Sequence, residues 1–228
     1  MIVHVDSLLD GARRSRGTTV IIDVFRAFTT AAVALSRQAA EIVLTAEPEE
    51  ALLLRSRGVG EMCMGEVGGR RPPGFDFGNS PHELSTANVA GKRLIQSTRA
   101  GTVGVCAVPV GLPIFAASLT TARATARAVL RDSPDEVTLV AMGMRGEMRT
   151  DEDELCALYL RNLLEGRSPD PSAIAALVRS SAEAGKYGDP RQPHFHRGDL
   201  ELAVAVDCFD FAVPVTTEGG LLVARLRR

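Results

Sequence analysis

Apolar residues along the chain fall into short β-branched runs separated by Ala-rich stretches with helical spacing. Such runs predict strands that are buried on both faces of a sheet. We expect strands at 18–24, 41–46, 61–65, 92–97, 113–118 and 136–142. Helices are expected at 26–37, 48–57, 119–130, 150–165, 171–184 and 199–207. Two last apolar runs, 211–215 and 221–226, predict a closing hairpin across residues 217–220.

Alternation of strands and helices is typical of an α/β fold. We therefore expect three α/β/α layers around a largely parallel, mixed sheet, with the hairpin at its C-terminal end. The chain shows no internal repeat and no low-complexity linker, so residues 1–228 are expected to form one domain. A hydrophobic content of 45% is enough to build its core.

Charge and composition exclude several classes of protein. The net charge is −2 and the isoelectric point is about 6.1, which argues against a nucleic-acid-binding surface. No apolar run reaches the ~18 residues of a membrane span, and the charged start of the chain does not resemble a signal peptide. The four cysteines are widely spaced, which fits neither a zinc ribbon nor a disulfide scaffold. We expect a cytoplasmic protein with reduced thiols.

One segment, residues 73–83 (PGFDFGNSPHE), has too many glycines, prolines and acids for a regular helix or a central strand. Together with Gly65-Glu66 just upstream, it predicts a surface loop that is pinned in place. Loops of this kind often carry binding groups on a rigid scaffold. The segment is therefore a better place to look for chemistry than the helices.

Polar side chains also follow three of the predicted strands, where ligands bind in open α/β sheets. These residues are Asp23 and Arg26 after the first strand, 97–101 with Thr98 and Arg99 after the fourth, and 143–146 followed by Glu152 and Asp153 after the sixth. The loop adds Glu66, Asp76, Asn79 and Glu83. Carboxylates suit a divalent cation such as Mg²⁺, and guanidinium groups suit a phosphate.

Each of these residues also has a structural explanation. Asp23 could cap a helix, with Arg26 as its ion-pair partner. Asp153 lies three residues after Thr150, which is the spacing of a capping box. Residues 97–99 could simply begin a helix, and residues 79–81 could form an Asx turn. No P-loop and no haloacid-dehalogenase Asp pair is present, since position 25 is Phe.

Taken together, several blocks resemble the 2-phosphosulfolactate phosphatase family. They are DVFRAFTT at 23–30, GE at 65–66, GFDFGNSP at 74–81, residues 92–102, GxxG at 143–146 with EDxLC at 152–156, and the tail at 207–214. Of these, GFDFGNSP is the most specific, and the resemblance covers nearly the whole chain.

The resemblance implies a Mg²⁺-dependent acid phosphatase that hydrolyses (2R)-2-phospho-3-sulfolactate, a step of coenzyme M synthesis in methanogens. Family positions carried over to this chain are Asp23, Arg26, Glu66, Asp76, Asn79, Ser80 and Asp153. On this basis we expect catalysis by Asp23, Arg26 and Asp153. Metal binding is expected at Glu66, Asp76 and Asp23. A carboxylate would act as base or as nucleophile, and both remain open.

Substrate binding is expected at Thr98, Arg99, Asn79 and Ser80. Arg99 departs from the family, in which many members have Asn at this place, so it could bind the sulfonate or mark a different substrate. The expected ligand is a small phosphorylated sulfonate or hydroxy acid. A non-catalytic anion-binding protein and a structural subunit of an oligomer, such as a homodimer, are the alternatives.

Overall fold

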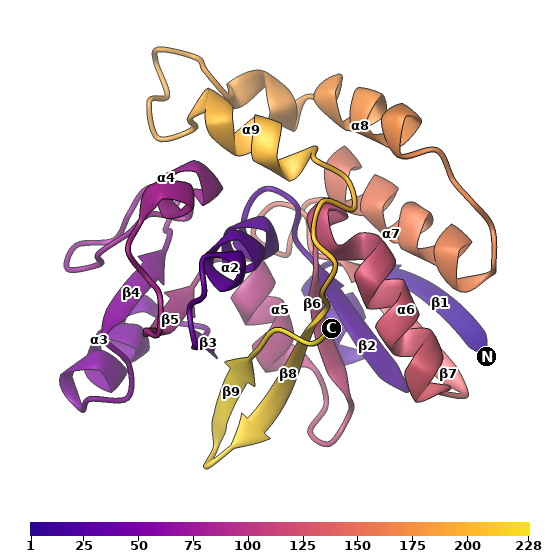
Figure 1. Cartoon of the computed structure of the whole chain (residues 1–228), viewed down its shortest axis with the longest axis horizontal. Coiled ribbons are helices and arrows are strands. Elements are labelled where there is room, and N and C mark those ends of the chain that lie inside the picture. The colour runs from indigo at the N-terminus through magenta and orange to yellow at the C-terminus, as the bar shows by residue number, and fades with distance from the viewer.

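The computed structural model describes all 228 residues and contains one nine-stranded sheet with helices on both faces (Figure 1). The strands are β1 (Ile2–Ser7), β2 (Thr18–Ile22), β3 (Glu41–Thr45), β4 (Met62–Gly65), β5 (Arg93–Ser97), β6 (Ile114–Ala117), β7 (Glu136–Ala141), β8 (Val213–Glu218) and β9 (Leu221–Ala224). The expected α/β class, the mixed sheet and the C-terminal hairpin are confirmed. The first strand, β1, was not predicted.

Helices connect most of these strands. They are α1 (Leu8–Arg13), α2 (Ala27–Ser36), α3 (Pro48–Ser56), α4 (Pro81–Thr86), α5 (Gly101–Ala107), α6 (Ala122–Asp132), α7 (Asp151–Leu164), α8 (Pro171–Arg179) and α9 (Arg197–Ala203), with the 3₁₀ turns η1 (Leu119–Thr121) and η2 (Glu183–Lys186). The end of the 73–83 segment is thus helical, because Pro81 opens α4 and the Ser80 hydroxyl caps it. No helix is both long enough and apolar enough to cross a membrane.

The order of strands in the sheet is β1-β7-β2-β6-β8-β9-β3-β5-β4. Strands β1, β7, β2 and β6 form one parallel group, and β3, β5 and β4 form another. The C-terminal hairpin β8–β9 lies between the two groups and is antiparallel to both β6 and β3. The hairpin therefore closes the centre of the sheet and not its edge.

Side-chain alternation explains why the central strands are apolar throughout. Ile21 of β2 points into one core cluster, whereas Val20 and Ile22 point into the other. Helix α2 is buried along nine of its ten residues, as expected for a helix that is apolar all round. Helix α5 packs against β2 and β6 of one group and β3 and β5 of the other. These two helices fill the space between the groups.

Three antiparallel steps separate β6 from β3, so the two parallel groups run in opposite directions along the ladder. Strand twist accumulates over these steps. The C-terminal ends of the two groups nevertheless meet: the carboxylate of Asp23, after β2, accepts a hydrogen bond from the backbone of Gly101, after β5, at 2.9 Å. The candidate site is built on this junction.

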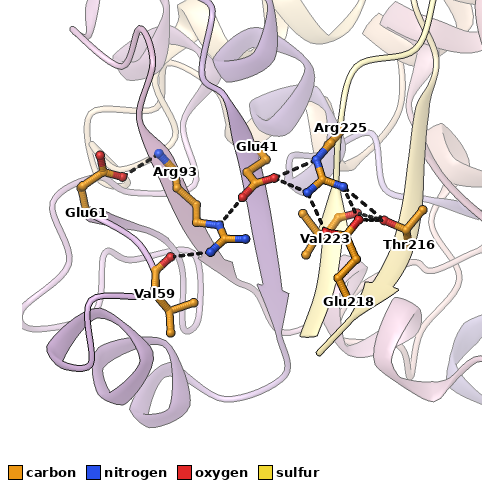
Figure 2. Close-up of polar contacts among 8 residues, drawn as sticks. All are labelled: Glu41, Val59, Glu61, Arg93, Thr216, Glu218, Val223 and Arg225. Atoms are coloured by element: carbon orange, nitrogen blue, oxygen red, sulfur yellow. Dashed lines mark hydrogen bonds and ion pairs between the residues drawn. The ribbon is translucent and has the colours of Figure 1, made fainter. Parts of the chain in front are cut away.

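A network of charged side chains ties the hairpin to its neighbour strands (Figure 2). Arg225 donates to Glu41 of β3 at 2.7 Å and to Glu218 of β8 at 2.8 Å. Glu41 also forms an ion pair with Arg93 of β5, and the Arg93 backbone donates to Glu61. We call Glu41, Arg93, Glu218 and Arg225 the hairpin network. It links residues of β3, β5 and β8 to Arg225, which directly follows β9.

Candidate active site

A polar cavity of about 250 Å³ lies where the two parallel groups meet. Its walls come from the residues that follow β2, β4, β5 and β7, and from the segment 183–196. At ~30 Å³ per water molecule in the liquid, the cavity has the size of a small metabolite. Only four of its lining residues are hydrophobic, so a charged or strongly polar ligand fits it better than an apolar one.

Asp23 lies at the base of this cavity and is 4% exposed. Its two carboxylate oxygens accept hydrogen bonds from the backbone N–H groups of Ala27 and Gly101, each at 2.9 Å. Position 101 needs glycine, because a Cβ there would lie 2.8 Å from the Asp23 carboxylate. Burial, and next to it the nearby charge of Glu66, raises the pKa of Asp23 to about 6, although the backbone donors oppose the shift.

Glu66 and Arg99 face the cavity from the second parallel group. The Glu66 carboxylate accepts from the backbone N–H of Gly69 at 2.7 Å and of Arg99 at 2.8 Å, which joins the ends of β4 and β5. The Arg99 guanidinium donates to Glu47 at 2.9 Å. Both Glu47 and Arg99 are well exposed there, so the pair is weak and a ligand can compete with it.

Two adjacent acids at the start of α7 have different surroundings. Asp153 accepts from the backbone of Val24 at 2.7 Å and of Gly143 at 2.8 Å, and therefore ties the end of β2 to the end of β7. It does not line the cavity. The capping box with Thr150 is absent, because the Thr150 hydroxyl has no hydrogen-bond partner. Burial raises the pKa of Asp153 well above its ordinary value.

Glu152 does line the cavity, although only 3% of it is exposed. Its Oε2 atom has no hydrogen-bond partner in the protein. Burial raises the pKa of Glu152 to about 7. The sequence placed Glu152 among the polar residues after the sixth predicted strand but not among the expected site residues, although four consecutive acids in the first turn of α7 exceed what a helix dipole requires. That excess was the signal for a further acid in the site.

Arg26 lines the cavity too, but its partner is Asp199 and not Asp23. The buried guanidinium donates to Asp199 at 2.6 Å and to the carbonyl of His194 at 2.9 Å. It also lies 4.8 Å from the centre of the Phe195 ring, within the range of a cation–π contact. Arg26 thus holds the segment 183–196 over the cavity, and much of its hydrogen-bonding capacity is already used.

The loop residues divide between the cavity and the scaffold. Asn79 lines the cavity, is 5% exposed, and its side-chain oxygen has no partner. Ser80 lies outside the lining: its hydroxyl donates to Asp199 at 2.6 Å and accepts from the backbone of Glu83. A helix cap therefore replaces the Asx turn that the sequence suggested.

Besides Asp153 and Ser80, two further predicted site residues, Asp76 and Thr98, lie outside the cavity lining. Asp76 accepts from the Arg55 guanidinium and from the backbone of Cys63, both at 2.8 Å, and so fastens the loop to β4. The Thr98 hydroxyl accepts from the backbone N–H of Thr102 at 3.1 Å, at the start of α5. Neither side chain lines the cavity, so the structure does not bring these two residues together with the other predicted site residues.

Oxygen donors in the cavity suit a hard cation. Asp23, Glu66 and Glu152 supply carboxylates, and Asn79 supplies a buried oxygen without a partner. No three His, Cys, Asp or Glu side chains form a preformed metal cluster. Mg²⁺ commonly keeps several waters and binds one or two carboxylates together with a substrate phosphate. The donor set therefore fits Mg²⁺ held jointly by protein and substrate.

Comparison with known proteins shows the family of this chain. The sequence matches the family 2-phosphosulpholactate phosphatase over residues 3–191. A probable 2-phosphosulfolactate phosphatase of Deinococcus radiodurans is 33% identical, and the match covers 95% of this chain and 90% of the relative. Proteins of the same name are 30% identical in Bacillus subtilis (88% and 87% covered) and 38% identical in Synechococcus sp. (94% and 92% covered).

These matches define the class of protein first: the relatives carry the name of a phosphoric monoester hydrolase, an enzyme that cleaves phosphate esters. The chain belongs to the 2-phosphosulfolactate phosphatase family. The resemblance carried by the GFDFGNSP segment and the other blocks is thereby confirmed.

Proposed function

We propose that this chain is a Mg²⁺-dependent phosphatase that hydrolyses 2-phospho-3-sulfolactate or a closely related phosphorylated hydroxy acid. The observation that carries the proposal is one cavity in which Asp23, Glu66 and Glu152 face Arg99. Carboxylates without neutralising cations suit a metal, and a guanidinium suits the phosphoryl oxygens. Family membership supports the same substrate class.

Mg²⁺ would be held by Glu66, Asp23 and the side-chain oxygen of Asn79. When bound, it would polarise the phosphoryl group and offset part of its negative charge. Asp76, which fastens the loop to β4, is no longer included in the metal site. Asp153 does not line the cavity, and because its carboxylate joins the backbone of Val24 to that of Gly143, it would act as a positioning residue between β2 and β7.

Asp23 would act on the attacking side of phosphorus. Deprotonated above about pH 6, it would accept a proton from water or attack phosphorus itself. Glu152, protonated below about pH 7, would donate its proton to the ester oxygen as the bond from phosphorus to that oxygen breaks. Arg99 would offset charge on the equatorial oxygens. Both acids hold the required protonation state in a mildly acidic window.

The direct test is phosphate release from 2-phospho-3-sulfolactate by the purified protein, with Mg²⁺ and with a chelator. Turnover that requires Mg²⁺ supports the proposal. Binding of 3-sulfolactate without any phosphate release would instead identify a non-catalytic anion-binding protein. Trapping labelled phosphate on the denatured enzyme would show that Asp23 is a nucleophile, and its absence under single-turnover conditions would favour the base.

A further inference from the structure

The cationic side chains that line the cavity differ in their partners. They are Arg26, Arg99, Arg145 and Lys186. The first two and the last form ion pairs with carboxylates. Arg145 forms no ion pair and no side-chain hydrogen bond, although it lines the cavity. A guanidinium without a protein anion at the wall of a ligand cavity is available to an anion of the ligand.

Arg145 has a backbone conformation that glycine adopts with less strain. Its φ angle is 56°, in the left-handed region, and it lies between Gly143 at 62° and Gly146 at 72°. A non-glycine residue in this region costs ~1 kcal/mol or more. The loop is nevertheless fixed: the backbone of Gly143 donates to Asp153 at 2.8 Å, and that of Leu9 donates to Gly146 at 3.0 Å.

Arg145 and Arg99 belong to opposite parts of the sheet. Arg99 follows β5 of one parallel group, and Arg145 follows β7 of the other, yet both line the same cavity. An ester with two anionic groups can therefore contact one guanidinium from each group.

We propose that Arg145 binds the second, non-reacting anionic group of the substrate and sets a preference for phosphate esters that carry a sulfonate or carboxylate. This inference rests on the proposed function, in which Arg99 and the metal site hold the phosphoryl group. It assigns a specificity-determining role to a residue that the sequence blocks did not single out.

The test compares Arg145→Gln with Arg149→Gln. Arg149 lies in the same connection but pairs with Glu154 and does not line the cavity, so it controls for the loss of one positive charge. Three esters are used: 2-phospho-3-sulfolactate, 2-phospholactate, which lacks the sulfonate, and isopropyl phosphate, which lacks both acids. For R145Q we expect kcat/KM on 2-phospho-3-sulfolactate to fall about 10- to 100-fold, mainly through KM.

For R145Q, kcat/KM on isopropyl phosphate should change less than about twofold. For R149Q, kcat/KM on all three esters should equal that of the unchanged protein. If kcat/KM of R145Q falls as much on 2-phospholactate as on 2-phospho-3-sulfolactate, Arg145 binds the carboxylate. If it falls only on 2-phospho-3-sulfolactate, Arg145 binds the sulfonate. An equal loss on all three esters, or no loss on any, overturns the proposal. Arg145→Gly should reproduce the loss of R145Q without backbone strain, which excludes misfolding as its cause.

Calorimetric binding of 3-sulfolactate separates this inference from the proposed function. R145Q should weaken that binding by the same factor, and R149Q should not. If no ester is hydrolysed but this difference persists, the proposed phosphatase function is wrong and the anion site at Arg145 stands. If hydrolysis proceeds and R145Q binds 3-sulfolactate as tightly as the unchanged protein, the assignment of Arg145 fails alone.

Discussion

The cavity and the hairpin network both gather acids with arginines, but they satisfy the acids in different ways. In the cavity, Asp23 and Glu66 accept hydrogen bonds from backbone N–H groups. In the hairpin network, Glu41 and Glu218 accept from the guanidinium of Arg225 (Figure 2). The first acids form no ion pair with an arginine or lysine, whereas the second are paired with arginine.

This difference separates chemistry from scaffolding. A carboxylate that is oriented by backbone dipoles keeps its charge available for a metal ion or for proton transfer. A carboxylate paired with arginine has already used its charge to hold strands together. The pKa values follow the same division: burial raises that of Glu152 to about 7, while Arg225 and Thr216 lower that of Glu218 to about 2.

The largest effect is expected for Asp23→Asn. The substitution removes the carboxylate proposed to act on phosphorus and turns an amide donor toward one of two backbone N–H groups. Turnover should fall about a thousandfold or more. The mispaired donor should also lower the free energy of unfolding by about 1–3 kcal/mol. Phosphate release and thermal unfolding measure the two losses, and full turnover in the folded variant would show that Asp23 is not catalytic.

Glu152→Gln should cost about 100-fold in turnover and remove the alkaline limb of the pH–rate profile, because the proton donor is lost. The limb itself should fall near pH 7 in the unchanged enzyme, following the raised pKa of Glu152. A variant that keeps the alkaline limb would assign it to another group. The rates are measured at saturating Mg²⁺ across the pH range.

The two regions should also respond to pH with opposite signs. The raised pKa of Glu152 contributes stability that is complete below about pH 4.5 and is lost as pH rises through about 7. The lowered pKa of Glu218 contributes stability that is complete above about pH 4.5 and is lost as pH falls toward about 2. In the presence of chelator, E152Q should reduce the dependence of the unfolding free energy on pH at alkaline pH. Glu218→Gln should reduce that dependence at acid pH. Equal slopes in both variants would contradict the comparison.

Glu41→Gln tests the scaffold directly. It leaves Arg93 without its carboxylate and Arg225 with Glu218 alone. The free energy of unfolding should fall by about 1–3 kcal/mol, or several degrees in midpoint. Because the network touches no cavity residue, kcat and KM should stay within about twofold. A large loss of turnover at a temperature where the variant is folded would show that the position of the hairpin affects the active site.

The smallest effect on activity is expected for Asp76→Asn. Its carboxylate binds Arg55 and the Cys63 backbone, and the side chains of Asp76 and Arg55 are both partly exposed, so the loss of stability should be about 1 kcal/mol. The Mg²⁺ concentration that gives half-maximal activity should not change. A clear rise in that concentration would show that Asp76 contributes to metal binding.

Strand positions and strand-end acids were predictable because they depend on neighbours along the chain. The buried run of β2 ends at Asp23, and a polar group there must face a ligand or a backbone donor. The direction of Asp76 was not predictable: Phe75 is packed in the core, and nothing in the spacing shows that the next side chain turns toward Arg55. Glu152 and Asp153 differ only by one step around a helix, and tertiary contacts decide which of them faces the cavity.

The position of the hairpin in the sheet was likewise not predictable from the sequence pattern. The apolar runs of β8 and β9 predict that they pair with each other, but not that β8 pairs with β6 and β9 with β3. Those pairings join residues about one hundred and one hundred and eighty positions apart along the chain. Local periodicity carries no information about such partners.

The central hairpin has a consequence for synthesis of the protein on the ribosome. Its strands, β8 and β9, follow every strand of both parallel groups along the chain. Until this segment leaves the exit tunnel, β6 and β3 each present a free edge to the surroundings. The hairpin cannot join the two parallel groups before residues 213–224 have been synthesised, and until then the open edges of β6 and β3 favour aggregation and binding by chaperones.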